Sequence, residues 1–159
     1  MNFLVFTQYF IQFIIAMAAT VAFGILFSLP ERQYLYAALT GAFGWIIYLL
    51  IRNAGADVVI YPFVSAFALT ILSRVFAVLE KNPVTVYLLP GIFPIVPGAG
   101  IYYTAYYFIT NDMNAFTENG SETAKIAGAI AFGIIFALAI PQKLFKHLSP
   151  DSARESVRM

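Results

Sequence analysis

The sequence of 159 residues contains no cysteine, only one histidine and few charged residues. The absence of cysteine excludes disulfides, thiol catalysis and thiolate-bound metals. The single histidine, His147, excludes a histidine metal cluster, so no metal or other cofactor is expected. Charged residues make up 11% of the chain, compared with about 25% in soluble domains. A formal net charge of +1 gives no electrostatic basis for binding nucleic acid.

Hydrophobic residues dominate instead, at 61% of the chain. A soluble fold of this length would leave roughly a third of its surface exposed to water, too much for so apolar a sequence. A lipid bilayer covers such a surface. Because a helix satisfies its own backbone hydrogen bonds in lipid, the composition predicts an all-α polytopic membrane protein.

Five transmembrane spans are expected, since each crossing needs about 20 mostly apolar residues. Four regular spans are predicted at Leu4–Ser28, Tyr34–Ile51, Val58–Leu79 and Thr123–Ile140. The fifth lies in a long irregular region from Val84 to Ala115. The first apolar run lacks a basic flank and is too long for a cleavable signal peptide, so it is predicted to be a mature helix. Residues 1–141 are thus predicted to form a transmembrane domain, and residues 142–159 a polar cytoplasmic tail.

The distribution of basic residues predicts the orientation in the plasma membrane. Five spans place the termini on opposite sides, and Lys and Arg concentrate on the cytoplasmic side. With the C-terminus inside, the inner segments hold Arg32, Lys81, Lys143, Lys146, Arg154 and Arg158. The outer loops then hold only Arg52 and Lys125, and the expected outer loop before the last span is acidic, with Asp112, Glu118 and Glu122. The N-terminus is therefore expected outside and the C-terminus in the cytoplasm.

Small residues spaced four apart indicate where helices pack closely in lipid. They occur at Ala37 and Gly41, at Ala124 and Gly128, and at Ala129, Gly133 and Ala137. Such spacings also arise by chance in membrane helices. Gln8 and Gln12 share one face of the first span, as i and i+4 neighbours do, and either find partners inside the protein or mark the outer interface.

The segment from Pro83 to Gly100 contains four prolines and three glycines within an apolar stretch. An interior proline removes a backbone donor and clashes with the preceding turn, at about 3 kcal/mol or more. Irregular backbone at membrane depth persists only where protein or a water-filled cavity satisfies it. The segment is therefore predicted to be a discontinuous or re-entrant element, followed by a helix that starts near Gly98.

Broken helices are typical of binding sites in transporters, where the start of a half-helix presents free amides to a carboxylate. The glycines would let a ligand approach the backbone, and the first turn of the new helix would supply hydroxyls. The alternative is a structural connector at the surface. The candidate substrate-binding residues are Pro90, Gly91, Pro94, Pro97, Gly98, Gly100, Tyr102, Tyr103 and Thr104.

Charged residues within or beside the spans are candidates for gating or coupling. Arg74 lies inside a span, where a charge at the bilayer centre costs at least about 2.5–3.5 kcal/mol. It either snorkels to the inner interface or belongs to the transport pathway. Asp57 and Asp112 flank spans and either carry a proton, gate the site or serve as solvated end charges. No compelling acid lies at membrane depth, so proton coupling would need an acid from a partner. No catalytic motif is present, so an enzyme is not expected.

Arg74, Pro83 and the run from Leu89 to Tyr102, Leu-Pro-Gly-Ile-Phe-Pro-Ile-Val-Pro-Gly-Ala-Gly-Ile-Tyr, together resemble the signature of the threonine/serine exporter family. The chain is most similar to the small subunit of the split, two-chain exporters. This resemblance implies proton-driven export of threonine and serine, or of succinate as in some similar pairs. It also implies a larger membrane subunit as partner, or self-association, with a binding site near the midplane where two halves meet.

Two further hypotheses remain open at the level of the sequence. One is a membrane scaffold or regulatory subunit that transports nothing itself. The other is a homo-oligomeric channel, whose flux would not saturate and would ignore the proton gradient. The broken segment favours a transporter, because a scaffold has no need for costly irregular backbone.

Overall fold

The computed structural model describes residues 2–146, and within this range every regular element is a helix. The long helices are α1 (Asn2–Leu26), α2 (Tyr34–Asn53), α3 (Ile60–Leu79) and α6 (Met113–Ala139). The shorter ones are η1 (Glu31–Gln33), α4 (Thr85–Ile92), η2 (Phe93–Ile95), α5 (Gly98–Ile109) and α7 (Lys143–Lys146). The all-α prediction is confirmed.

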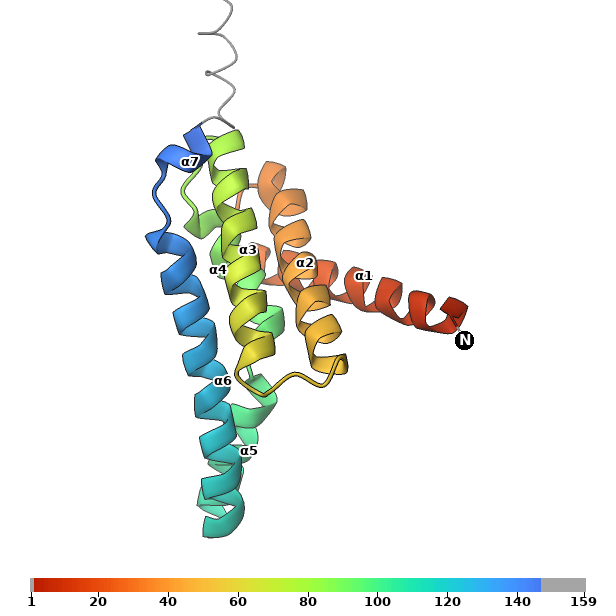
Figure 1. The fold of residues 1–159 in the computed structure, drawn as a ribbon, viewed down its shortest axis with the longest axis vertical. Helices are drawn as coiled ribbons and strands as arrows, with labels where there is room; N and C mark the ends of the chain where they lie inside the picture. Colours follow the sequence, from red (N-terminus) through yellow and green to blue (C-terminus); the bar gives the residue numbers. More distant parts are fainter. Residues whose placement is uncertain (1, 147–159) are drawn as a thin grey trace, which may run out of the picture.

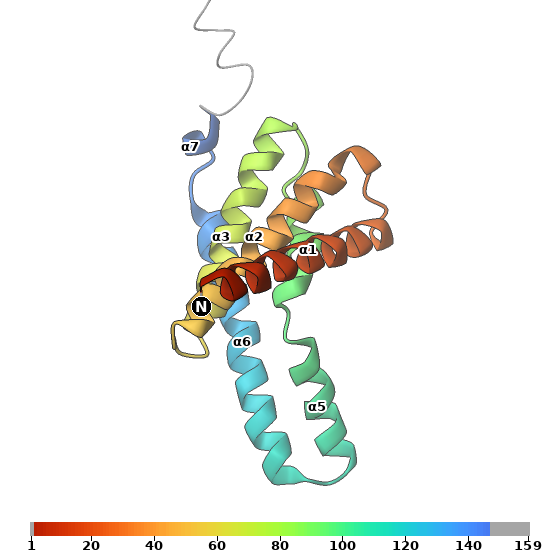
Figure 2. The same cartoon turned by 90° about the vertical axis from the view of Figure 1, so that its right-hand side faces the viewer.

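Helices α2, α3 and α6 lie side by side, and α1 crosses α2 at a steep inclination (Figures 1 and 2). Helix α2 is central, since it contacts α1, α3 and α4. Four helices are long and apolar enough to cross a membrane, and α4, η2 and α5 together form a bent fifth candidate. The predicted number of five spans agrees with this set.

Helices α5 and α6 form an antiparallel hairpin that extends past the turn between α2 and α3 (Figure 2). None of the residues of α5 is buried. The turn between α5 and α6 lies at one end of the molecule, and α7 lies at the other end (Figure 1).

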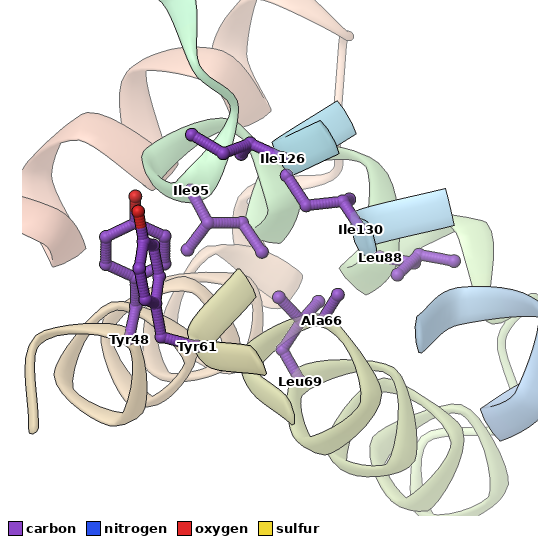
Figure 3. Packing of buried hydrophobic residues seen from close by; sticks show 8 residues of the cluster. All are labelled: Tyr48, Tyr61, Ala66, Leu69, Leu88, Ile95, Ile126 and Ile130. Atoms are coloured by element: carbon purple, nitrogen blue, oxygen red, sulfur yellow. The ribbon is translucent and has the colours of Figure 1, made fainter. Parts of the chain in front are cut away.

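The main core lies where α2, α3, α4 and α6 meet (Figure 3). Leu69 and Ala66 of α3 are fully buried there, and Ile130 of α6 packs on the same cluster. The rings of Tyr48 and Tyr61 meet edge to face, with centroids 4.7 Å apart. Aromatic pairs with this geometry contribute beyond their buried area, so they hold α2 and α3 together.

Most of the small residues that were predicted to lie in close helix contacts are buried. Ala37, Gly41, Ala129, Gly133 and Ala137 are buried. A Cβ on Gly133 would lie 2.6 Å from the carbonyl oxygen of Phe63, so only glycine allows α6 to approach α3 this closely. Ala124 is exposed, however, and nothing lies within 4 Å of a Cβ built on Gly128. That pair is therefore not buried in a close helix contact within the described residues.

Helix α1 is held to α2 by a polar contact as well as by close packing. The indole Nε1 of Trp45 donates a hydrogen bond of 3.0 Å to Oε1 of Gln12. The hydroxyl of Thr20, on α1, lies in the space that a side chain at Gly41 would need. Gln12 thus has an interior partner, whereas Gln8 is exposed.

The predicted loop before the last span was wrong. Helix α6 begins at Met113 rather than near Thr123, so Glu118, Glu122 and Lys125 lie on a helix and not in an outer loop. The carboxylate of Asp112 accepts a hydrogen bond of 3.1 Å from the amide of Ala115 and caps this helix. Hydropathy locates only the apolar part of a helix. The first half of α6 is polar, so the signal for its start is the capping residue Asp112 and not hydropathy.

Candidate functional site

The predicted break in the fourth span is confirmed by the backbone. Helix α4 passes into η2, Val96 is extended with φ −64° and ψ 132°, and α5 begins at Gly98. The axes of the two halves differ by 56°. Pro97 occupies the N-cap position of α5, where a missing amide removes no hydrogen bond from the helix.

The first half of the break is anchored within the protein. Pro90 is fully buried, and a Cβ on the neighbouring Gly91 would lie 3.0 Å from Cγ2 of Thr40 in α2. The ring of Phe93 stacks on Phe23 of α1, with centroids 3.9 Å apart. Protein contacts therefore surround this half, as irregular backbone at membrane depth requires.

The second half of the broken segment, α5, begins at an exposed position. Gly98 and Ala99 are exposed, and nothing lies within 4 Å of a Cβ built on Gly98. The amide of Ile101 donates to the carbonyl of Pro97 at 3.0 Å, the first bond of the helical pattern. The amides of Ala99 and Gly100 precede that bond, so the helix offers them no carbonyl of its own. The start of α5 is thus an accessible positive dipole end.

Two threonines flank this helix start. The hydroxyl of Thr123 in α6 lies against Gly100, in the space that a side chain at Gly100 would need. The hydroxyl of Thr104 donates a hydrogen bond of 2.7 Å to the carbonyl of Gly100. Its methyl group faces α6, where a Cβ on Gly120 would lie 3.2 Å away. Sequence reasoning missed Thr123, which stands more than twenty positions after Gly100.

An apolar groove of about 530 Å³ runs between α5 and α6 next to the helix start. Its walls include Ile101, Phe108 and Phe116, with Thr104, Gly120 and Thr123 among the smaller residues. The helix start and the groove together offer amides for an anionic group, hydroxyls, and apolar surface for a short side chain.

The predicted substrate-binding residues thus divide into two groups. Pro90 and Gly91 belong to the packing of α4 on α2, and Pro94 is half-buried in η2. The later residues surround the helix start: Pro97, Gly98, Gly100, Tyr102, Tyr103 and Thr104. The exposed fractions of Tyr102 and Tyr103 are 64% and 49%, and their rings pack edge to face with each other.

The three candidate gating or coupling residues lie apart from the helix start along the chain. Arg74 is buried near the end of α3, where its Nη1 donates a hydrogen bond of 2.6 Å to the carbonyl of Ala137. Asp57 is exposed between α2 and α3, and its carboxylate accepts from the amide of Val59 at 3.0 Å. Asp112 is exposed between α5 and α6 and caps α6. Within residues 2–146, no group of three or more potential metal ligands comes together.

These features define an all-α polytopic membrane protein with one helix broken beside an accessible half-helix start, an arrangement found in secondary transporters. The chain belongs to the family described as Threonine/Serine exporter, ThrE, whose model matches residues 12–140. This range extends from α1 to just past α6 and includes the whole break. The suspected family is therefore confirmed. No match was found among curated proteins or among solved structures.

Proposed function

We propose that this chain is one subunit of a proton-coupled secondary transporter that exports threonine and serine together with a larger membrane subunit. The exposed start of α5 carries the proposal, because it presents first-turn amides beyond a 56° break in a membrane-crossing segment. An amino-acid carboxylate matches the positive end of the helix dipole. Threonine and serine also carry a hydroxyl and a short side chain, which suit the threonine hydroxyls and the apolar groove.

Succinate is the second candidate substrate. It brings a carboxylate to the same helix start but has no ammonium or hydroxyl group. The family membership supports threonine and serine over succinate. A transport assay that compares all three therefore decides the substrate.

The surface of the α5–α6 hairpin supports a membrane partner. Helix α5 has no buried residue, and the groove between α5 and α6 is open. A second open groove, of about 430 Å³, runs beside Ala124 and Gly128. Small residues allow close helix contact in lipid. We propose that the larger subunit, or a second copy of the chain, packs here, so that substrate binds near the membrane midplane between two halves.

We further propose that residues 1–141 form the membrane domain, with the N-terminus outside and residues 142–159 as a cytoplasmic tail. In this orientation Arg32 and Lys81 lie on the cytoplasmic side and Asp57 on the outer side, as the positive-inside rule favours. Residues 147–159 lie outside the described residues. Arg74, Asp57 and Asp112 are kept as candidates for gating or coupling.

The decisive experiment measures amino-acid efflux from cells that lack this chain. The cells are loaded with a threonine- or serine-containing dipeptide, and internal threonine, serine and succinate are followed. Build-up of one of them, reversed by an intact copy, supports export and identifies the substrate. Unchanged efflux, even after overexpression with the partner, would favour a scaffold, and non-saturating flux that ignores the proton gradient would favour a channel.

A substitution at Gly98 tests the site itself. Leucine there meets no atom within 4 Å at its Cβ, so the fold should persist while the approach to the helix start is blocked. Transport by Gly98→Leu is expected to be abolished at unchanged membrane abundance. Ala54→Leu, in the exposed turn between α2 and α3, is the matched control and should transport normally. Normal transport by Gly98→Leu would count against this site.

A further inference from the structure

A pocket of about 360 Å³ is lined by residues near the end of α3 and around α7. These elements lie at the end of the molecule opposite the α5–α6 turn (Figure 1). The end of α3, the turn into α4 and the segment around α7 enclose the pocket. Its polar lining consists of Arg74, Lys81, Asn82 and Gln142. A pocket of this size suits a small molecule or a lipid headgroup.

Arg74 is the buried charge of this pocket, with an exposed fraction of only 4%. Within residues 2–146, its guanidinium contacts neutral groups. Nη1 donates to the carbonyls of Ala137 and Leu138, at 2.6 and 3.5 Å, and the group lies 4.4 Å from the centre of the Phe145 ring. The end of a helix dipole and an aromatic face both attract a cation, but neither supplies a full negative charge.

A buried cation without a counter-ion is costly, so a membrane protein usually pairs it. Guanidinium carries five N–H donors in a fixed fork, and the contacts to α6 engage only Nη1. Among the described residues, the other donors of Arg74 are therefore left for a ligand in the pocket. An oxyanion, whether carboxylate or phosphate, matches both the charge and the fork geometry.

The other polar groups are held at the same pocket. The side-chain amide of Asn82 donates a hydrogen bond of 3.1 Å to the hydroxyl of Tyr87, which donates one of 2.6 Å to Oε1 of Gln33. Tyr87 is fully buried and Gln33 nearly so, which fixes the turn that carries Asn82. Lys81 adopts a left-handed conformation, with φ 55°, and adds a second positive charge to the lining.

We propose that this pocket binds one oxyanion, with Arg74 as its principal ligand. Two sources share this chemistry: the carboxylate of a free amino acid, and the phosphate of an anionic lipid headgroup. A carboxylate would make the pocket a loading site on the side opposite the α5–α6 turn, a role that rests on the proposed export function. A phosphate would make it a lipid site that stabilises the fold whatever the protein transports.

The test measures thermal unfolding of the purified full-length chain in a neutral detergent, so it does not depend on transport. Threonine is added in one arm and phosphatidylglycerol in another, with phosphatidylcholine as the neutral lipid control. Arg74→Lys keeps the positive charge but loses the planar guanidinium, which can hold an oxyanion through two parallel hydrogen bonds. Lys81→Asn removes a charge and suits a left-handed backbone. Arg52→Gln, an exposed arginine at the end of α2, is the matched control.

We expect either threonine or phosphatidylglycerol to raise the unfolding temperature of the wild type and of Arg52→Gln. The concentration needed should rise at least tenfold in both Arg74→Lys and Lys81→Asn. A response to threonine alone identifies a carboxylate site, and one to phosphatidylglycerol alone a lipid phosphate site. The proposal is overturned if neither ligand acts, or if every variant that folds responds like the wild type. Because Arg74 also binds the end of α6, Lys81→Asn keeps the test valid even if Arg74→Lys fails to fold.

Discussion

The methyl group of Thr40 fills the space beside Gly91, where an added Cβ would lie 3.0 Å from Cγ2. Thr40 is fully buried in α2, and its hydroxyl donates to the carbonyl of Tyr36 at 2.9 Å. The side chain therefore cannot turn away without breaking that bond. Gly91 is thus required by the contact between α4 and α2, whereas Gly98 of the same motif borders open space.

Gly91→Val is expected to destabilise the protein, because its methyl groups would overlap Thr40. Overpacking of this kind costs about 1–3 kcal/mol. Thermal unfolding in detergent should show a clear fall in the unfolding temperature. Gly98→Ala is the control and should unfold like the wild type, because its Cβ meets no neighbour. Equal stability of Gly91→Val and the wild type would contradict this packing.

Hydropathy and helix-breaking residues predicted much of this fold. Predicted spans at Tyr34–Ile51 and Val58–Leu79 correspond to α2 and α3 within two residues at each end. Uninterrupted apolar runs mark such helices directly. A helix start near Gly98 was also predicted, because the prolines up to Pro97 interrupt any helix that precedes it.

Tertiary contacts could not be predicted in the same way. Nothing in the motif distinguishes Gly91 from Gly98, because burial of a glycine depends on which helix covers it. Thr123 meets Gly100, and Arg74 meets Ala137, across large separations in the chain. Periodicity describes one helix at a time and does not identify its neighbour.

Helix α6 offers a second test of close packing. Gly133→Ala would place a methyl group 2.6 Å from the carbonyl oxygen of Phe63 and 3.0 Å from Cβ of Ala66. Both neighbours are fixed within α3, so the helices must move apart, at a cost of about 1–3 kcal/mol. Gly128→Ala, on the same helix, meets no atom within 4 Å. Only Gly133→Ala is expected to lower the unfolding temperature. Equal effects of the two substitutions would contradict the packing of α6 on α3 through the face that carries Gly133.

The buried hydroxyl of Tyr87 predicts a loss of stability in Tyr87→Phe. This change leaves Oε1 of Gln33 without its hydrogen-bond donor in a site that is only 7% exposed. An unsatisfied buried polar group costs about 1–3 kcal/mol. Tyr102→Phe, whose ring is 64% exposed, is the control and should unfold within error of the wild type. If both variants behave alike, the hydrogen bonds of Tyr87 contribute nothing measurable.

The contact between Trp45 and Gln12 can be followed by fluorescence, because Trp45 is the only tryptophan in the sequence. Gln12→Ala removes the acceptor of the indole hydrogen bond and loosens α1 from α2. Collisional quenching of Trp45 should therefore increase. Gln8→Ala changes an exposed position one turn away and should leave quenching unchanged. Unaltered quenching in Gln12→Ala would show that this bond does not hold α1 in place.

The proposed orientation is testable because the natural chain has no cysteine, so each introduced thiol is a unique label. Ala54 and Asn111 lie in exposed turns at the proposed outer side, and Glu31 is exposed at the proposed inner side. A membrane-impermeant maleimide added to intact cells should label Ala54→Cys and Asn111→Cys but not Glu31→Cys. Opening the membrane should make Glu31→Cys reactive and so prove its presence. The reverse pattern would invert the orientation, and would place the Arg74 pocket on the outer face, where it could not load a cytoplasmic substrate.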